Sequence, residues 1–558
     1  MKTGKLILTI SAVLFVLCAL LPLTACESLP PLDSPTEFVV DDNYNITWMS
    51  VDYARGYELN ITNNITGASQ NATARRAAIS LAYLEEGDYD IQIKAKGDGK
   101  KYSDSKWSNA IYFQKSDEAG CIYKLIGNGS EYQLSSVSPT LESIVLQDSY
   151  RGKPVTQIGE GAFRRASKIE EVVVGKYVVE IGSMAFFNCG YLTKIELPDT
   201  IETIGEAAFQ ACKLLTEFTF PSKVKTASKS MFAYCRELTT INFNNVTAID
   251  ELAFSGCSAL TSLELSDKII TVGKGAFRDC TALETVKLGG NLKYVAIQAF
   301  SDCSSLSKVI FSDSGNFKQI GDSAFRNCTA LTSVTLNDGV EYVGNYAFYD
   351  CSQLATINIP DSVTTVGYTA FKGTKIYNNA KEADEMFVYI DKWLVDVLYS
   401  DTKPINILTA DGKTSSTEEE NVYEIQSGIV GIADSLFKNC KTLTEVTVPK
   451  SILYIGNYTF ANCSTLWRFN SQGTSLKIIG VGAFSNDTKL SSVLIANSRP
   501  ANDKLEVIED YAFYGCTSLN FGTGSTAMRF IPASVKRIGM YAFKNAGFYK
   551  NPDEYGVI

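Results

Sequence analysis

The feature that most constrains this chain is a Phe that returns with a period of roughly 23 residues, from Phe163 to Phe543. Each of the 15 copies follows an Ala, or a Met, Leu or Thr, and they stand at positions 163, 186, 209, 232, 254, 277, 300, 325, 348, 371, 437, 460, 484, 513 and 543. Successive position numbers differ by 22 to 25, except for one difference of 66 and two late ones of 29 and 30. A fixed period of this length predicts a solenoid, in which each coil packs only on its neighbours.

Each repeat contains two short extended pieces joined by the turn that carries the Phe. The first has the pattern Val-x-x-Ile-Gly, as in Ile201–Gly205, and the second has the pattern Leu-x-x-Ile-x-Leu, as in Leu192–Leu197. One such piece cannot bury its apolar side alone, whereas identical pieces stacked in parallel about 4.8 Å apart bury Phe on Phe and Leu on Leu. The Gly permits a backbone turn that a Cβ would hinder. We therefore expect a mainly β protein with a leucine-rich-repeat solenoid of about 15 coils.

Residues 1–25 predict a signal peptide of the lipoprotein type. Lys2 and Lys5 precede an apolar run that is too short to favour a spanning helix, and Leu23–Cys26 follows at once. This stretch resembles a bacterial lipoprotein signal, which implies cleavage before Cys26 and lipid attachment to its thiol. The alternative is an ordinary secretory peptide. We expect an extracytoplasmic protein that is lipid-anchored at the bacterial cell surface, with residues 26–34 as a tether.

Residues 35–115 differ from the repeats and predict a small β-sandwich. Stretches such as Tyr89–Lys94 alternate apolar and polar residues and are separated by Asn, Gly and Asp. The placing of Trp48, Tyr57 and Tyr89 resembles a fibronectin type III module, in which the Trp fills the core between the sheets. We interpret the module as a spacer, and a ligand site in its loops is the alternative.

The remaining chain is predicted to contain two runs of repeats around an insertion. Residues 119–375 hold a capping hairpin and the first repeats, because the first coil would otherwise expose its apolar edge. Residues 376–428 interrupt the period and predict a β-hairpin insertion that continues the stack. Alternatively, Trp393 and the acidic stretch Ser415–Asn421 form part of a binding surface. Repeats resume over residues 429–548, which include the C-terminal end.

The repeat is similar to that of the BspA-like leucine-rich-repeat family of bacterial surface proteins. Residues 181–198 follow the family order Ile-Gly-x-x-Ala-Phe-x-x-Cys-x-x-Leu-x-x-Ile-x-Leu-Pro, apart from ordinary apolar exchanges. The resemblance covers residues 120–548. It implies a secreted or surface-attached protein that binds other proteins, including host matrix components, and is not an enzyme. It identifies no particular ligand.

The cysteines follow the same period as the Phe. Among the 14 in the chain, 11 lie three residues after a repeat Phe, at positions 189, 212, 235, 257, 280, 303, 328, 351, 440, 463 and 516. This spacing predicts one internal column of reduced thiols that act as small apolar fillers, because parallel side chains keep Cβ atoms farther apart than a disulfide allows. A metal column is the alternative, but the chain has no His and no paired Cys-x-x-Cys arrangement. The redox state is left open.

One face of the solenoid is the natural place for a ligand. Side chains alternate along a strand, so the third and fifth positions of Leu-x-x-Ile-x-Leu are predicted to face solvent. These positions carry equal numbers of acids and bases and are rich in Thr and Asn, and both a binding strip and a solvated face without a ligand stay open. The candidate residues are Lys194, Glu196, Glu217, Thr219, Thr240, Asn242, Glu264, Lys287, Lys308, Thr335, Asn358, Glu445 and Arg468, with Trp393 from the insertion.

The residue types present disfavour several classes of function. The chain has 51 basic and 61 acidic residues, a formal charge of -10, and its bases do not cluster, which disfavours nucleic acid as a partner. The absence of His removes the commonest general base and every Ser-His or Cys-His pair. Glycosidase-type carboxylate pairs cannot be judged from sequence. We expect no enzyme, and therefore no catalytic residues, cofactor or metal.

The function predicted is that of a non-catalytic, monomeric surface lipoprotein. It would bind an extracellular or host protein through the solenoid, in adhesion or host interaction. The alternative is a glycan-binding accessory lipoprotein of a saccharide-uptake system, in which Trp393, Trp467 and neighbouring Tyr residues would contact the sugar. The identity of the ligand is left open.

Overall fold

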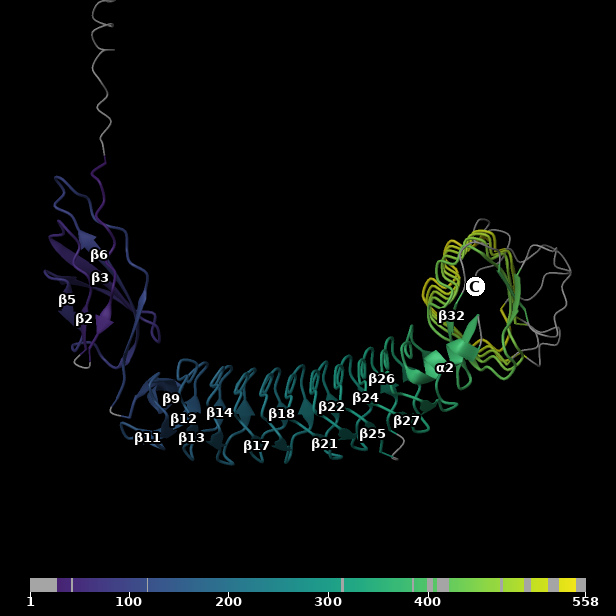
Figure 1. The fold of residues 1–558 in the computed structure, drawn as a ribbon, viewed down its shortest axis with the longest axis horizontal. Helices are drawn as coiled ribbons and strands as arrows, with labels where there is room; N and C mark the ends of the chain where they lie inside the picture. The colour runs from purple at the N-terminus through teal and green to yellow at the C-terminus, as the bar shows by residue number, and fades with distance from the viewer. Residues whose placement is uncertain are drawn as a thin grey trace, which may run out of the picture. The chain divides into compact units, whose positions relative to one another are not determined.

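The computed structural model of the protein describes residues 28–41, 44–117, 119–312, 316–383, 386–398, 405–408, 421–471, 475–495, 503–519 and 531–547. The predicted signal peptide, residues 1–25, and Cys26 lie outside these described residues. The chain separates into two compact units, Met1–Lys124 and Leu125–Ile558. Among the described residues their regular elements are almost all strands, which confirms the prediction of a mainly β protein (Figure 1).

The N-terminal unit is a sandwich of two antiparallel sheets. Its strands are β1 (Val39–Val40), β2 (Asn45–Thr47), β3 (Gly56–Asn63), β4 (Ser69–Ala74), β5 (Ala78–Ser80), β6 (Gly87–Lys96) and β7 (Ile111–Lys115). One sheet has the order β1-β2-β5 and the other has the order β4-β3-β6-β7. Along β6 the side chains of Tyr89, Ile91 and Ile93 are buried and those between them are half-buried. Trp48 packs edge-on against Tyr57, with 5.0 Å between the ring centroids.

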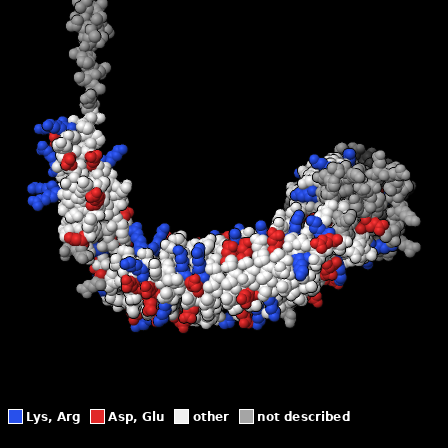
Figure 2. All heavy atoms as spheres, viewed as in Figure 1, with Lys and Arg blue, Asp and Glu red and all other residues white. Residues whose placement is uncertain are grey.

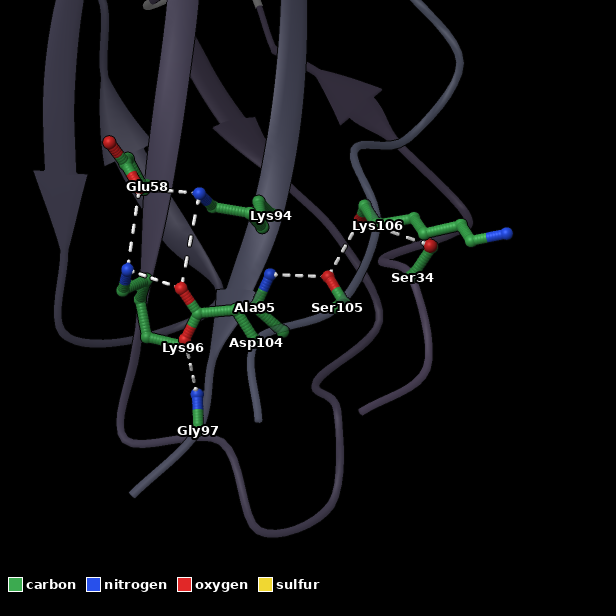
Figure 3. A network of polar contacts seen from close by, with 9 residues as sticks. All are labelled: Ser34, Glu58, Lys94, Ala95, Lys96, Gly97, Asp104, Ser105 and Lys106. Atoms are coloured by element: carbon green, nitrogen blue, oxygen red, sulfur yellow. Dashed lines mark hydrogen bonds and ion pairs between the residues drawn. The ribbon is translucent and has the colours of Figure 1, made fainter. Parts of the chain in front are cut away.

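A network of charged side chains ties the loop after β6 to the sheet (Figure 3). Lys94 and Lys96 of β6 lie 3.0 and 3.5 Å from the Glu58 carboxylate of β3. Lys96 also bonds to Asp104 in the loop, and Asp104 accepts a hydrogen bond of 3.0 Å from the Gly97 amide. The hydrogen bond from Lys94 lowers the pKa of Glu58, and the one to Asp104 raises the pKa of Lys96. Two lysines and two carboxylates balance one another in this network. We therefore interpret it as structural.

The second unit is a β-solenoid of about 14 turns, close to the number of coils predicted. Its first array, residues 158–374, has two rows of parallel strands. The three-residue strands are β13 (Glu171–Val173), β15 (Lys194–Glu196), β17 (Glu217–Thr219), β19 (Thr240–Asn242), β21 (Ser262–Glu264), β23 (Thr285–Lys287), β25 (Lys308–Ile310), β27 (Ser333–Thr335) and β29 (Thr356–Asn358). The two-residue strands are β14 (Glu180–Ile181), β16 (Thr203–Ile204), β18 (Thr226–Ala227), β20 (Ala248–Ile249), β22 (Thr271–Val272), β24 (Tyr294–Val295), β26 (Gln319–Ile320), β28 (Tyr342–Val343) and β30 (Thr365–Val366).

A cap precedes the first array. It consists of β8 (Cys121–Ile126), the 3-10 helix η1 (Gly127–Gly129), β9 (Glu131–Val137), β10 (Ser143–Val145), β11 (Ser149–Tyr150) and β12 (Lys153–Ile158). The strands β8 and β9 extend one row of the solenoid, in the order β16-β14-β12-β9-β8. The apolar edge of the first coil is therefore covered by strands of the same sheet.

A helix and an antiparallel strand pair connect the two arrays, where a β-hairpin insertion was predicted. They are α2 (Lys375–Ala383), which was not predicted, β31 (Phe387–Ile390) and β32 (Trp393–Val397). The Tyr377 hydroxyl of α2 donates to Asp396 of β32 at 2.5 Å. The Asp434 amide donates to the Val366 carbonyl at 2.9 Å, so the two arrays are also bonded directly.

The second array, residues 431–547, again has two rows of parallel strands. One row contains β33 (Ile405–Leu408), β34 (Asn421–Glu424), β36 (Leu443–Thr447), β38 (Arg468–Asn470) and β40 (Ser492–Leu494), with β33 and β34 contributed by the preceding segment. The other row contains β35 (Gly431–Ile432), β37 (Tyr454–Ile455), β39 (Ile478–Ile479), β41 (Val507–Ile508) and β42 (Arg537–Ile538), and β31 and β32 extend it.

The repeat Phe side chains form two internal stacks, one from Phe163 to Phe371 and one from Phe437 to Phe543. Within each stack neighbouring rings are nearly parallel, with interplanar angles of 2 to 19° and centroids 4.4 to 5.7 Å apart. The amide of a repeat Phe donates to a carbonyl of the next turn, as from Phe277 to Ala299 at 2.9 Å. Apolar burial and axial hydrogen bonds therefore recur together, turn after turn.

The Gly that ends the first extended piece lies against the backbone of the preceding turn. A Cβ at Gly205 would lie 2.4 Å from the Ser183 nitrogen, and one at Gly367 would lie 2.4 Å from the Asn345 nitrogen. Both distances are far shorter than a van der Waals contact. The prediction that a Cβ would hinder the chain here is confirmed, and the reason is close packing between turns.

Two residues in each regular turn adopt the left-handed conformation, two positions before and two after the Phe. In the turn of Phe325 they are Ser323, with φ 54°, and Asn327, with φ 59°. The later position is mostly Asn, Asp or Gly, which accept this conformation at the lowest cost. The earlier position also holds bulky residues, namely Tyr346, Tyr458, Tyr511 and Tyr541. The fold dictates the backbone at this position but does not dictate a Tyr.

The repeat cysteines are buried in one column per array, as predicted. The thiol of one turn donates to the carbonyl of the Phe in the preceding turn, from Cys189 to Phe163 at 3.3 Å and from Cys351 to Phe325 at 3.0 Å. Burial raises the pKa of Cys280 to about 12. The thiols are therefore hydrogen-bond donors as well as fillers, a role that their spacing alone did not predict.

Candidate ligand-binding surface

The exposed side chains of β15, β17, β19, β21, β23, β25, β27 and β29 form one surface of the first array, which we name the strand face. All the candidates on these strands are exposed, while central neighbours such as Phe218 and Val286 are buried. The register places Glu217 beside Thr240 and Thr219 beside Asn242. The prediction that the third and fifth positions face solvent is therefore confirmed for Lys194, Glu196, Glu217, Thr219, Thr240, Asn242, Glu264, Lys287, Lys308, Thr335 and Asn358.

Four of the six charged candidates on the strand face form ion pairs, and the six comprise three acids and three bases. Lys194 lies 2.5 Å from Glu196, and Lys287 lies 2.5 Å from Glu264 on the neighbouring strand. Figure 2 shows acidic and basic side chains interspersed along the visible side of the solenoid. Between the pairs lie short Thr and Asn side chains and Ile310, which is 39% exposed. The strand face is thus nearly neutral, and its short side chains project little from the sheet.

Trp393 does not lie on a binding surface, and that prediction is wrong. Its side chain is 1% exposed. The ring covers Gly431, where a Cβ would come within 2.3 Å of it, and stacks on Tyr454 with 6.1 Å between centroids. The physical reason is that β32 pairs with β35 as a strand of the second array, which turns the indole into the core. Residues 415–420 of the predicted acidic stretch lie outside the described residues.

Glu445 and Arg468 are neighbours on β36 and β38, but their surroundings differ from those on the strand face. Glu445 is only 8% exposed and lies 3.0 Å from the half-buried Arg468. The Glu445 carboxylate is withdrawn from solvent and held by the Arg468 guanidinium, which corrects its prediction as a ligand contact. The Arg468 guanidinium also lies 6.0 Å from the ring of Trp467, which is 44% exposed. Trp467 and Arg468 therefore stay accessible.

A second exposed surface lies on the turns that carry the Phe, and the sequence analysis missed it. In these turns Tyr346, Tyr368, Tyr511 and Tyr541 are 37 to 47% exposed. The signal was present in the sequence, because Tyr-Ala-Phe-Tyr occurs at residues 346–349 and again at 511–514. The repeat pattern does not reveal this surface, because the pattern is defined by positions that stay constant, whereas the tyrosine positions vary between repeats.

Neither a metal site nor a membrane-spanning helix is found among the described residues. Within them, no group of three or more Cys, Asp and Glu side chains is arranged to hold a metal ion. The part of the chain that the structure describes also contains no helix that is both long and apolar enough to span a membrane.

Comparisons with known proteins agree with the repeat architecture. The model of the BspA type leucine rich repeat region matches residues 134–261, 247–377 and 416–550, more than half of the chain. A search of curated proteins finds no match. Structures of leucine-rich-repeat proteins are similar in fold, and the solenoids of this family are typically non-catalytic.

Three of these structures illustrate the similarity. A leucine-rich repeat protein from Bacteroides ovatus is 20% identical, with 76% of this chain and 91% of that chain covered and a TM-score of 0.31. A leucine rich cell surface protein from Faecalibacterium prausnitzii is also 20% identical, with 76% and 97% covered and a TM-score of 0.29. The pneumococcal vaccine antigen PcpA is 15% identical, with 76% and 97% covered and a TM-score of 0.37.

The family match, the stacked Phe and Cys columns and the two rows of parallel strands all describe the same repeat. Members of the family are typically surface proteins. The chain belongs to the family of proteins with BspA type leucine-rich repeats.

Proposed function

We propose that this protein is a lipid-anchored surface protein that binds an extracellular protein through its strand face. The observation that carries the proposal is the exposed, in-register file of side chains on β15 to β29. Non-obligate protein interfaces are about as polar as the rest of a protein surface, so a Thr- and Asn-rich face is compatible with such a partner. The face carries no excess of one charge, which favours a protein over a charged polymer.

The repetition of the strand face also suits a large partner. Each turn adds only a few exposed side chains, whereas a stable protein interface buries on the order of 800 Å² on each partner. Several successive turns must therefore contribute to one interface. The regular stacking of the Phe column keeps these turns in a fixed register, which reduces the entropy lost on binding.

The proposal includes attachment through Cys26 and a spacer role for the sandwich. Two sheets with the strand orders β1-β2-β5 and β4-β3-β6-β7 support its interpretation as a fibronectin type III-like module. Lipid attachment is tested with Cys26→Ala, which should move the protein from the membrane fraction to the soluble fraction. An unchanged membrane fraction for Cys26→Ala would remove the anchor from the proposal.

Binding through the strand face is tested with arginine substitutions. The mature chain is measured against a panel of immobilised extracellular-matrix proteins, alongside the double variant Thr240→Arg/Asn242→Arg on β19. A matched control is Thr203→Arg on β16, which is exposed on the other row of strands. The proposal expects saturable binding that the double variant loses and the control keeps. Absence of binding across the panel, or equal binding by the double variant, counts against it.

A further inference from the structure

The described residues contain two clusters of three tyrosines, each built on a Tyr-Ala-Phe-Tyr sequence. Tyrosine cluster I consists of Tyr346, Tyr349 and Tyr368 in the first array, and tyrosine cluster II consists of Tyr511, Tyr514 and Tyr541 in the second. The first two rings of each cluster are 5.7 and 5.8 Å apart, at interplanar angles of 64 and 63°. The third ring comes from the next turn and differs between the clusters. Tyr368 lies three residues before its Phe, 5.8 Å from Tyr346 at 89°, whereas Tyr541 lies two residues before its Phe, 5.5 Å from Tyr511 at 51°.

These rings do not serve the core of the solenoid. Tyr346, Tyr368, Tyr511 and Tyr541 are each more than a third exposed, whereas the Phe rings beneath them are almost fully buried. Tyr346 and Tyr511 also occupy left-handed positions, with φ 55 and 57°, where Gly is accepted in other turns. The fold imposes this conformation in every regular turn, and other turns place smaller residues such as Ser230 and Thr369 there, so the backbone does not require a Tyr at this position.

Each cluster has a balanced charge environment. The Arg326 guanidinium lies 5.3 Å from the Tyr349 ring, and Asp350 follows in the same turn. The Lys544 ammonium lies 4.6 Å from the Tyr541 ring, and Asp510 directly precedes Tyr511. Bases and acids therefore occur together in the turns of both clusters, which argues against a strongly charged ligand.

Uncharged hydrogen-bonding groups lead up to the rings. In the second array the amides of Asn439, Asn462 and Asn486 form a ladder, with bonds of 3.0 and 3.2 Å between turns. The Asn486 amide lies over Gly515, where a Cβ would come within 2.5 Å of its oxygen, directly after Tyr514. Asn545 in the last turn donates to the Tyr514 hydroxyl at 3.5 Å. Amides and a phenol hydroxyl thus border cluster II. At the same positions beside cluster I, Asn327 donates to Asp302, and Asp350 lies over Gly373.

We propose that the two tyrosine clusters are binding sites for a neutral polysaccharide. The π-face of an aromatic ring is negative and attracts polarised C–H groups, which line the faces of a pyranose ring. Amides and phenols both donate and accept hydrogen bonds, as sugar hydroxyls require. Two such sites on one chain would bind a long polymer with avidity. This inference is independent of protein binding through the strand face, because it involves other residues on the turns.

The test is affinity electrophoresis of the mature chain in gels that contain a β-glucan, a xylan, a mannan or a starch. Polygalacturonate and heparin serve as charged comparators. The variants are Tyr346→Ala/Tyr368→Ala, Tyr511→Ala/Tyr541→Ala and the combination of all four. The matched control is Tyr191→Ala, which removes a tyrosine that is 58% exposed and belongs to neither cluster.

The proposal expects at least one neutral polysaccharide to retard the chain, with each double variant weakening binding about tenfold and the quadruple variant abolishing it. Replacement of the same four residues by Phe should keep most of the binding, because the rings remain. Tyr191→Ala should bind like the unaltered chain. The proposal is overturned if no neutral polysaccharide binds, if only the charged polymers bind, or if the quadruple alanine variant binds normally. Loss of matrix-protein binding in the quadruple variant, without sugar binding, would reassign the clusters to a protein partner and also overturn it.

Discussion

In the first array the position numbers of successive Phe differ by 22 to 25, whereas the last two differences in the second array are 29 and 30. The rings are nevertheless 5.0 and 5.4 Å apart across these long spacings, compared with 5.2 Å between Phe254 and Phe277. The stack therefore accommodates the longer spacings, and lengthening a loop costs little entropy. The comparison teaches that the phase of the Phe and its neighbours sets the core, while turn length is free to vary.

The arrays also differ in the polar side chains that they bury. Exposed ion pairs occur in both arrays, as between Lys287 and Glu264 and between Lys536 and Glu506, but in the second array Glu445 is also buried against Arg468. The Cys column continues to Cys351 in the first array, but Asp487 interrupts it in the second. The second array therefore buries acidic side chains, which cost stability, within the same architecture.

The largest effect should come from removing a ring inside a stack. Phe277→Ala removes a fully buried ring with stacked neighbours on both sides, so a loss of about 3–5 kcal/mol in the free energy of unfolding is expected. Phe543→Ala should cost less, because Phe543 stacks on one ring only and is 9% exposed. Denaturant unfolding followed by hydrogen exchange of each array measures both. Equal losses would show that position in the stack has no influence.

The next effect concerns Asp434, where the arrays meet. Burial, with a smaller contribution from the Asp322 charge, raises its pKa from 3.8 to about 6. Between these values the folded chain holds a proton that the unfolded chain has released, so stability falls as the pH rises from about 4 to 6 and is level above. The fall amounts to at most about 3 kcal/mol.

Asp434→Asn should remove most of this pH dependence and stabilise the protein at pH 7. Chemical unfolding between pH 4 and pH 7.5 gives the comparison. An unchanged slope in the variant would mean that Asp434 does not titrate in this window.

The next prediction compares the stability that a buried and an exposed ion pair contribute. Glu445→Ala leaves the half-buried Arg468 without its partner, so a loss of about 2 kcal/mol is expected, below the range for fully buried pairs. Glu264→Ala should cost less than about 1 kcal/mol, because both partners are exposed. Thermal unfolding of the two variants in low and high salt compares them. Similar losses would contradict the difference in burial.

The smallest effect should be a gain. Asp487 is fully buried, its Oδ1 accepts a bond of 2.7 Å from the Cys463 amide, and its Oδ2 has no hydrogen-bond partner. Burial also raises the pKa of Asp487 well above its usual value. Asp487→Cys restores the column and should stabilise the second array by about 1 kcal/mol. A lower melting temperature for this variant would show that the column does not require a thiol there.

The solenoid and its solvent-facing positions could be predicted because the repeat supplies its own alignment. Fifteen copies in one phase reveal which positions are constant, and alternation along the strands then places Thr240 and Asn242 outside. The thiol bonds to the Phe carbonyls could not be predicted, because they depend on how closely successive turns approach.

The errors lie where the repeat offers no comparison. The insertion occurs once, so nothing in the sequence distinguished an exposed Trp393 from a buried one, and the helix α2 had no second copy to reveal it. Glu445 matched the exposed positions by phase, but its burial and its ion pair with Arg468 depend on packing that the phase does not describe. The tyrosine clusters show the opposite case, because their signal is a local deviation from the repeat that occurs twice.

The buried cysteine column has a practical consequence for chemical labelling. A thiol with a pKa raised to about 12 and no solvent contact, such as Cys280, should not react with iodoacetamide in the native state. Alkylation then requires that its own coil opens. Because these thiols occur at known intervals along both arrays, peptide mapping after timed alkylation would reveal which coil opens first.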